Sequence, residues 1–319
     1  EETIVKLAKE IQRFPWPSTR DPDDWECIDN LGYWKDRKVT FTKINYSYGV
    51  INSRAFPDYE PFNIQEMLDK YGWATRLLYR YPRPNPRPMI ISTARSCPFN
   101  CSFCVHSHGA KYRARSIDNI MAEIKEIYDK YKFNILLIQD ELFAVNKKRL
   151  VEFCEALIRN KVIYGWDFIW MFQTHANAKL DLETMKLAKE AGCSLFSYGL
   201  ESASPTVLKS MNKKTKISQT EEAIKIAREV GIGFSGNLLF GDPVETEETI
   251  AETLAFHTKY SSSECIFIAF LTPYPGSKVF DYCIEKGIIK DKLAYYETID
   301  DSPFNMTQIS DQEWWGWVR

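Results

Sequence analysis

Short apolar runs alternate with stretches of helical periodicity from residue 89 onward. Parallel strands joined by right-handed helical crossovers produce this alternation, because the strands are buried on both faces and each helix covers the sheet with one apolar face. The pattern predicts an α/β fold, a partial, TIM-like (β/α)6 barrel. The predicted strands cover residues 89–93, 134–139, 166–172, 194–198, 234–240 and 265–270.

Helix signals lie between these runs. Ser116 is a suitable N-cap for a helix that reaches about residue 131, with Ile120, Ile124 and Ile127 at helical spacing. The same reasoning predicts helices over residues 147–159, 181–191, 220–230 and 246–260.

Polar residues follow most of the predicted strands. The loops after the strands of such a barrel converge on one mouth, so we expect the reactive groups there. The residues in these positions are the cysteine loop 96–104 after the first strand, Asp140 and Glu141 after the second, His175 and Asn177 after the third, Glu201 and Ser202 after the fourth, and Asp242 after the fifth.

The composition is that of a globular protein with a substantial core, with 45% hydrophobic and 26% charged residues. A net charge of −2 gives no global positive field for nucleic acid or for an anionic membrane. No apolar run approaches the ~20 residues of a membrane span, and no signal peptide is visible. We therefore expect a cytoplasmic protein with no membrane span and no nucleic-acid partner.

Three of the eight cysteines, Cys97, Cys101 and Cys104, stand in one loop at the spacing C-x-x-x-C-x-x-C. Chance gives this triplet in a chain of this composition with odds of only ~0.005. Three thiolates can hold three irons of a 4Fe-4S cluster and leave the fourth iron without a protein ligand. Such an open iron is a place for chemistry.

Other interpretations of the triplet stay open. His106 and His108 follow at once and would complete a tetrahedral zinc site, which predicts a zinc-binding interaction module. A disulfide framework is less suitable, because the remaining cysteines are scattered singly along a long chain. A barrel that keeps its cluster only for structure or electron transfer is a further alternative.

The triplet, with the aromatic Phe103 directly before its last cysteine, resembles the signature of the radical S-adenosylmethionine (radical SAM) superfamily. The resemblance covers residues 89–290. It implies that the open iron binds SAM and that one electron from the cluster cleaves SAM to methionine and a deoxyadenosyl radical, which abstracts a substrate hydrogen. It also implies an electron donor such as flavodoxin or ferredoxin.

The resemblance assigns roles to residues around the first two strand ends. Phe103 matches an aromatic position that packs near the adenine of SAM. Asp140 and Glu141 match an acidic motif that meets the methionine ammonium group of SAM. This chain has Gln139-Asp140-Glu141 where Gly-Gly-Glu is common, so the resemblance does not say which carboxylate makes that contact.

Further positions match at the fourth strand and beyond it. Glu201 and Ser202 match a segment that binds the ribose or the amino-acid part of SAM, and Lys213 matches a basic residue that neutralises the SAM carboxylate. Arg113 and Arg115 lie near the cysteine loop and are candidates to offset the negative charge of a cluster.

The first 88 residues point to one branch of the superfamily. Residues 1–7 resemble the last helix of a cobalamin-binding domain, and residues 54–62 resemble the linker that follows it. We therefore expect residues 1–88 to be the end of a truncated cobalamin-binding domain plus linker, residues 89–290 the radical SAM barrel, and residues 291–319 the start of a C-terminal extension. A helical cap with a linker is the alternative for residues 1–88.

The expected function is a cobalamin-dependent radical SAM methyltransferase with a 4Fe-4S cluster, SAM and cobalamin as cofactors. A radical SAM oxidative cyclase and a methylthiotransferase are the alternatives. The methylthiotransferase would need further cluster cysteines, which this sequence does not show. A small molecule, a lipid and a peptide all remain open as substrates.

Overall fold

The computed structural model describes residues 2–13, 25, 27–35, 37–44, 50–72, 83–105, 109, 111–299 and 305–318. The chain divides into two compact units, Glu1–Ile51 and Asn52–Arg319. The smaller unit contains helix α1 (Glu2–Arg13) and an antiparallel hairpin of β1 (Gly32–Lys35) and β2 (Lys38–Phe41). In this unit the hydroxyl of Thr3 donates to the carbonyl of Asp29 at 3.0 Å.

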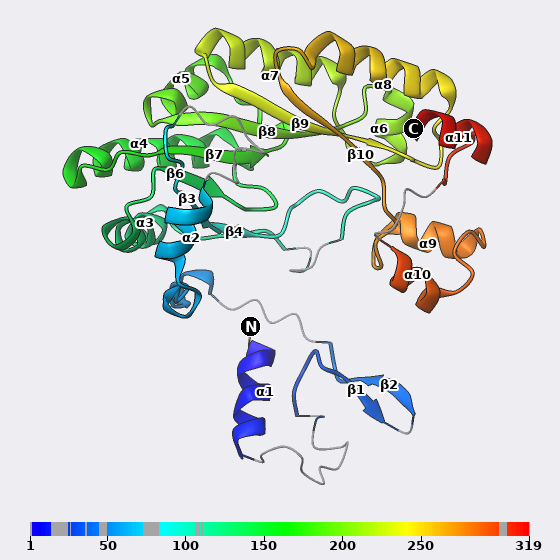
Figure 1. The fold of residues 1–319 in the computed structure, drawn as a ribbon, viewed down its shortest axis with the longest axis horizontal. Helices are drawn as coiled ribbons and strands as arrows, with labels where there is room; N and C mark the ends of the chain where they lie inside the picture. The colour runs from blue at the N-terminus through cyan, green and yellow to red at the C-terminus, as the bar shows by residue number, and fades with distance from the viewer. Residues whose placement is uncertain are drawn as a thin grey trace. The chain divides into compact units, whose positions relative to one another are not determined.

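The larger unit is built on a parallel sheet of six strands, in the order β10-β9-β8-β7-β6-β3 (Figure 1). β3 and β10 stand at opposite edges, so the sheet is open, as the prediction of a partial barrel requires. The strands are β3 (Pro88–Ile91), β6 (Ile135–Ile138), β7 (Ile169–Thr174), β8 (Cys193–Glu201), β9 (Gly233–Phe240) and β10 (Cys265–Phe270).

Five helices cover the sheet, and several of them begin at a residue whose side chain caps the helix. The side chains of Ser116, Asp181 and Thr246 accept hydrogen bonds from the backbone three residues on, as N-caps do. The helices are α3 (Ile117–Tyr131), α4 (Lys147–Tyr164), α5 (Leu182–Glu190), α7 (Ile217–Val230) and α8 (Glu247–Tyr260).

Helix α4 runs five residues beyond its predicted end at residue 159. It ends at Gly165, whose φ of 65° lies in the left-handed region that favours glycine. Val162 and Ile163 in the added turn are exposed. The prediction was wrong because the apolar periodicity fades before the backbone signal that ends the helix.

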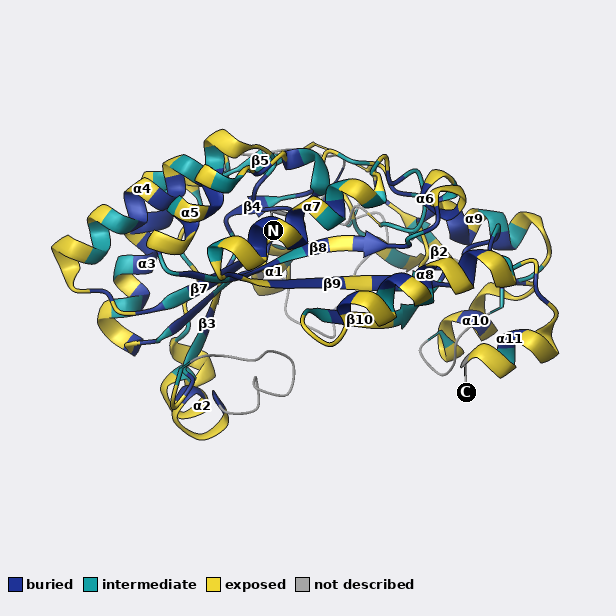
Figure 2. Cartoon of the chain, turned by 90° about the horizontal axis from the view of Figure 1, so that it is seen from above, coloured by how far each residue is buried: buried dark blue, intermediate teal, exposed yellow. Residues whose placement is uncertain are grey.

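An aromatic core crosses the middle of the sheet. The rings of Trp170 and Phe172 on β7, Phe196 on β8 and Phe234 on β9 are buried and contact one another at centroid distances of 5.2 to 6.0 Å. Each such side chain stabilises the fold by roughly 2–3 kcal/mol through burial alone. Figure 2 shows the buried residues concentrated along the strands and on the inner faces of the helices.

Shorter elements complete the larger unit, and two of them bound the cysteine loop. The antiparallel pair β4–β5 joins the two ends of the cysteine loop, and the sequence pattern did not predict it because two-residue strands carry no alternation. The remaining elements of the larger unit are β4 (Ala94–Arg95), β5 (Arg113–Ala114), η2 (Ile51–Ser53), η3 (Glu60–Phe62), α2 (Ile64–Tyr71), η5 (Ala176–Ala178), α6 (Pro205–Ser210), α9 (Lys278–Glu285), α10 (Lys292–Thr298) and α11 (Asp311–Val318).

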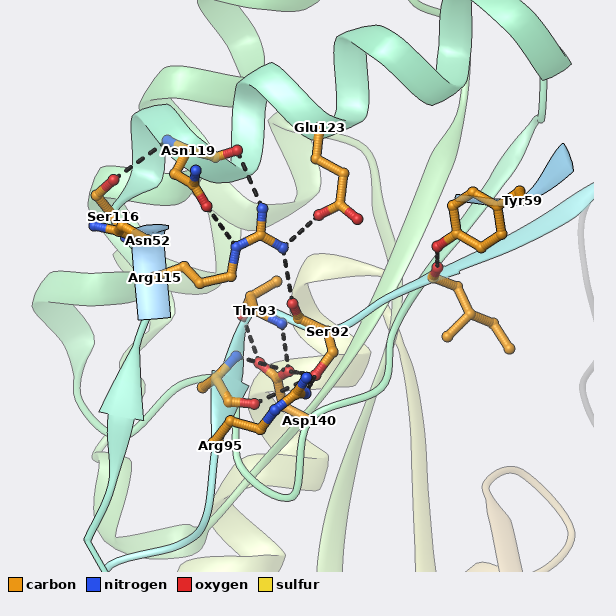
Figure 3. Close-up of polar contacts among 12 residues, drawn as sticks. Asn52, Tyr59, Ser92, Thr93, Arg95, Arg115, Ser116, Asn119, Glu123 and Asp140 are labelled. Carbon is orange, nitrogen blue, oxygen red and sulfur yellow. Dashed lines mark hydrogen bonds and ion pairs between the residues drawn. The ribbon is translucent and has the colours of Figure 1, made fainter. Parts of the chain in front are cut away.

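The segment before the sheet packs on its first strand–helix unit (Figure 3). Asn52 accepts a hydrogen bond from the backbone N–H of Ser116 at 2.9 Å, and the hydroxyl of Tyr59 donates to the carbonyl of Ile90 at 3.4 Å. The guanidinium of Arg115 lies over the ring of Phe56, 5.4 Å from its centroid. This segment therefore belongs to the same unit as the sheet.

A search of the described segments for a helix with the length and apolar character needed to cross a membrane found none.

Candidate cofactor site at the strand ends

The cysteine loop is held by backbone hydrogen bonds to two other elements. The N–H of Ser102 donates to the carbonyl of Met211 after α6 at 2.9 Å, and the N–H of Val279 in α9 donates to the carbonyl of Ser102 at 3.1 Å. The carboxamide of Asn212 donates to the carbonyl of Asn100 at 2.7 Å. The loop is thus fixed between α6 and α9, beyond the end of β8.

The three thiols are partly desolvated and free. Cys101 is buried, and Cys97 and Cys104 are half-buried. Burial raises the pKa of each thiol, that of Cys104 to about 11, and neighbouring thiols raise the pKa values of Cys97 and Cys104 further. The ammonium of Lys213 acts in the opposite direction on all three.

This donor set suits iron and sulfide, since soft thiolates are the ligands of iron–sulfur clusters. Within the described segments, no three His, Cys, Asp or Glu side chains converge on one point as ligands of a single metal ion do. A cluster holds its cysteines farther apart than a single ion does, because each cysteine binds a different iron. His106 and His108, on which the zinc interpretation rests, lie outside the described residues.

Glu201 and Lys213, assigned separately from the sequence, form one buried ion pair. The Glu201 Oε1 and the Lys213 Nζ lie 2.6 Å apart, with side chains 8% and 7% exposed. Burial alone would lower the pKa of Lys213, but the carboxylate of Glu201 and the thiols of Cys101 and Cys97 together raise it. Lys213 therefore stays charged between a carboxylate and the cysteine loop.

The backbone of β8 is shaped around this pair. Glu201 has a φ of 62°, and the pairing of β8 with β9 shifts register between Gly199 and Glu201. A Cβ atom on Gly199 would lie 2.4 Å from the Glu201 Oε1 and 2.6 Å from the Lys213 Nζ. A side chain at position 199 would therefore force one of the two charged groups to shift.

Asp140 is saturated by hydrogen bonds from the segment that leads into the cysteine loop (Figure 3). Its Oδ1 accepts from the backbone N–H groups of Thr93 at 2.6 Å and Ala94 at 3.0 Å, and its Oδ2 accepts from the hydroxyl of Thr93. Burial raises the pKa of Asp140, and these hydrogen bonds oppose the rise. Asp140 is thus a brace for the start of the loop.

Glu141 has a different environment from its neighbour. Its side chain is exposed, and its carboxylate lies close enough to Cys97 and Cys104 to raise their pKa values. Of the two acidic residues after β6, Glu141 is therefore the one whose charge acts on the thiols.

Phe103 and Ser202 both contact the protein interior. Phe103 packs against a second apolar cluster that includes Met211 and Val279. The hydroxyl of Ser202 lies 3.0 Å from that of Thr253 in α8 and accepts from the backbone N–H of Ser204 at 3.0 Å. The Ser202 side chain is therefore engaged with α8.

Arg115 is used inside the fold. Its guanidinium donates to the carboxylate of buried Glu123, to the carboxamide of Asn119 at 2.7 Å and to the carbonyl of Ser92 at 2.9 Å (Figure 3). These contacts link the end of β3 to α3, so the guanidinium of Arg115 is engaged within the fold.

Sequence reasoning missed two features at the C-terminal ends of the strands. The ring of His175 stacks on that of Phe99 in the cysteine loop at 3.8 Å, and burial lowers the pKa of His175 to about 4. Glu245, one turn after Asp242, is fully buried and accepts from the N–H of Gly241 at 2.6 Å. Its position after a buried strand, just before the N-cap Thr246, is the signal that could have found it.

Residues 91–257 match the family model of the radical SAM superfamily, which is more than half of the chain. The chain belongs to the radical SAM superfamily. Members of this superfamily use a 4Fe-4S cluster and SAM, and these are the cofactors implied for the site.

Two curated relatives illustrate the range of this similarity. An uncharacterised methyltransferase of Pyrococcus horikoshii is 30% identical over 214 residues, which is 66% of this chain and 45% of that protein. An anaerobic magnesium-protoporphyrin IX monomethyl ester cyclase of Rubrivivax gelatinosus is 30% identical over 275 residues, 85% of this chain and 46% of that protein. The chain spans about half the length of these curated relatives.

The fold also matches a solved structure. TsrM of Kitasatospora setae, a radical SAM methyltransferase solved with cobalamin and a 4Fe-4S cluster bound, aligns with a TM-score of 0.67 at 18% identity. The match covers 90% of this chain and 52% of that chain. At this identity the two proteins share a fold.

Proposed function

We propose that this chain is the barrel part of a cobalamin-dependent radical SAM methyltransferase whose substrate is a small organic molecule, a lipid or a peptide. Membership in the superfamily supports the radical chemistry. The methyltransferase names of relatives and the cobalamin bound in TsrM support the branch.

One observation carries the proposal. Three thiols in one loop lie beside the ion pair of Lys213 and Glu201 at the C-terminal ends of the strands. A cluster held there would supply the electron that cleaves SAM to methionine and a deoxyadenosyl radical. The residues of this chain hold the cluster, orient SAM and keep water out.

Each predicted residue has a suitable task in this scheme. Cys97, Cys101 and Cys104 hold three irons. Lys213 binds the SAM carboxylate, because it stays charged and can exchange the Glu201 carboxylate for that of the ligand. Glu141, exposed near the thiols, accepts from the SAM ammonium group.

Two further residues shape the pocket for the nucleoside. Glu201, released in part from Lys213, accepts from the ribose hydroxyls. Phe103, fixed by its packing on the second apolar cluster, offers a ring edge to the adenine. Asp140 and Ser202 do not bind SAM in this scheme but hold the surrounding backbone in place through the hydrogen bonds described above.

The partners follow from the chemistry. Reductive cleavage needs an electron donor, and flavodoxin or ferredoxin is the expected class. We infer a reducing, cytoplasmic location, because both free thiols and an iron–sulfur cluster persist best there.

The cysteine assignment is tested by anaerobic reconstitution with iron and sulfide. The parent chain should bind close to four irons per protein and convert SAM to deoxyadenosine with dithionite. Cys101→Ala should no longer cleave SAM. Cys265→Ala, at the first residue of β10 and away from the cysteine loop, should still cleave it. Cleavage that persists in Cys101→Ala, or zinc in place of iron in the parent, would contradict the proposal.

A radical SAM cyclase is the second candidate, favoured by the cyclase relative that aligns with 85% of this chain. The two functions differ in their products. A methyltransferase that recharges cobalamin from SAM releases S-adenosylhomocysteine, whereas a cyclase does not. Full-length protein supplied with cobalamin, SAM and reductant should therefore form S-adenosylhomocysteine, and formation of deoxyadenosine alone would favour the cyclase.

A further inference from the structure

A pocket of about 970 Å³ opens between the turn after β7 and the segment that joins α6 to α7. Asn212 lines this pocket and also donates to the carbonyl of Asn100, so the pocket borders the outer side of the cysteine loop. Figure 1 shows α6 close to the end of β8, where this segment begins. The pocket has no part in the scheme proposed above.

The lining of the pocket is positive and uncompensated. It contains Lys209, Lys214 and Lys216, and none of its lining residues is acidic. These three lysines are exposed and form no ion pair with the residues that the structure describes, whereas Lys213 between them turns inward to Glu201. Three like charges in eight residues repel one another, and a bound anion would relieve that repulsion.

The start of α7 adds to this field. Lys216 is the N-cap of this 14-residue helix, and its first turn carries no acidic residue. The free N–H groups of a helix N-terminus favour an anion in the position where an acidic side chain would otherwise lie.

The lysine-bearing loop is fixed in place by carboxamides. Asn177 donates to the carbonyl of Lys214 at 3.3 Å, and Gln219 accepts from the N–H of Lys216 at 2.8 Å. Leu208 and Ile217 add an apolar surface to the lining. The pocket thus combines positively charged residues on a loop fixed by hydrogen bonds with space for an organic group.

We propose that this pocket binds a phosphorylated small molecule. Its phosphate groups lie among Lys209, Lys214 and Lys216 at the start of α7, and its organic part lies on Leu208 and Ile217. Phosphate suits this site because lysines bind it as point charges and because two linked phosphates can reach more than one of the three. The phosphate belongs either to the substrate or to a separate effector.

Calorimetric titration of the reconstituted protein with inorganic pyrophosphate tests the site. The parent should show saturable binding that weakens with added salt. A triple variant, Lys209→Gln, Lys214→Gln and Lys216→Gln, should bind pyrophosphate at least about tenfold more weakly, which corresponds to about 1.4 kcal/mol.

The matched control removes the same charge elsewhere. Lys147→Gln, Lys148→Gln and Lys186→Gln alter three exposed lysines on α4 and α5 and should leave the affinity unchanged. Ser218→Asp, which places a carboxylate at an exposed position in the first turn of α7, should weaken binding without a loss of helix stability. An equal loss in the control, or no saturable binding by the parent, would overturn the proposal.

SAM cleavage distinguishes the two sources of phosphate. If pyrophosphate changes the rate of deoxyadenosine formation in the parent but not in the triple variant, the site binds an effector. If it binds without changing that rate, the site holds the phosphate of a substrate. The titration itself needs no turnover, so this proposal can fail or succeed independently of the function proposed above.

Discussion

Asp140 and Glu201 are both buried carboxylates at the ends of strands, yet they have different partners. Asp140 accepts hydrogen bonds from two backbone N–H groups and a hydroxyl of the segment that enters the cysteine loop. Glu201 contacts one lysine ammonium, which also faces the thiols. A carboxylate bound to backbone cannot change partners without moving the chain, whereas one bound to a flexible lysine can.

This difference shows how to distinguish a carboxylate that supports the fold from one that binds a ligand when the two look alike in the sequence. Burial and charge do not distinguish Asp140 from Glu201. The identity of the partner does, because a ligand can replace a side chain but not the backbone of a strand. The following predictions test this distinction, beginning with the largest effect.

Asp140→Ala should destabilise the fold more than a change at Gly199, Glu245 or Glu201. It leaves the N–H groups of Thr93 and Ala94 buried without an acceptor, at a cost of about 3 kcal/mol or more. Chemical denaturation measures the loss in the free energy of unfolding. Asp129→Ala, which removes an exposed ion pair with Lys125, is the control and should be nearly silent. A small loss in Asp140→Ala would show that Asp140 is no brace.

Gly199→Ala should break the Glu201–Lys213 pair from the backbone side. The added Cβ would lie within 2.6 Å of both charged groups, so one of these side-chain ends must shift and disturb the buried pair, at a cost of about 1–3 kcal/mol. Thermal unfolding and SAM affinity should both fall. Gly316→Ala in α11, where nothing lies within 4 Å of the new Cβ, should lower neither quantity. Normal SAM affinity in Gly199→Ala would mean that the pair is not part of the binding site.

Glu245→Gln extends the comparison to the end of β9. Burial raises the pKa of Glu245 from 4.5 to about 7, so the folded state binds its proton more tightly than the unfolded state does. The free energy of unfolding therefore falls as the pH rises from 4.5 to about 7.

The Glu245→Gln variant lacks this contribution and should be more stable than the parent by about 3 kcal/mol above that range, and similar to it below. Denaturation curves across pH measure this difference. Glu252→Gln, on an exposed part of α8, controls for the loss of charge. A constant difference at every pH would assign the effect to packing instead of to the proton.

Glu201→Gln should act on SAM binding and leave the cluster in place. The carboxamide can still accept from Lys213, but it offers the ribose a weaker acceptor, so SAM affinity should fall about tenfold. Iron and sulfide content should not change. Anaerobic equilibrium binding and metal analysis measure the two quantities, and an equal loss of both would make Glu201 structural.

Much of the fold could be predicted from the sequence, because buried parallel strands and amphipathic helices leave strong periodic patterns. All six strands and the five covering helices were found, and Ser116 and Thr246 cap their helices. The end of α4 was missed because Gly165 ends it after the apolar pattern has stopped. The β4–β5 pair was missed because it is too short for any pattern.

The candidate site was harder to predict than the fold. The cysteine triplet is a local motif, and its loop lies at the expected edge. The pairing of Glu201 with Lys213 joins two positions that were assigned separately, and only the bulge in β8 and the missing side chain of Gly199 make it possible. Spacing along the chain likewise does not predict the backbone N–H groups that donate hydrogen bonds to Asp140.

The contacts of Asn52, Phe56 and Tyr59 with the first strand–helix unit also bear on how the protein should be cut for expression. A fragment that starts at residue 89, where the first predicted strand begins, would lack these contacts, including the one between Phe56 and Arg115. The start of the cysteine loop would then be less restrained. A fragment that starts just before residue 52 would keep it. The shorter piece should therefore lose iron sooner on storage, although both contain every residue expected to bind it.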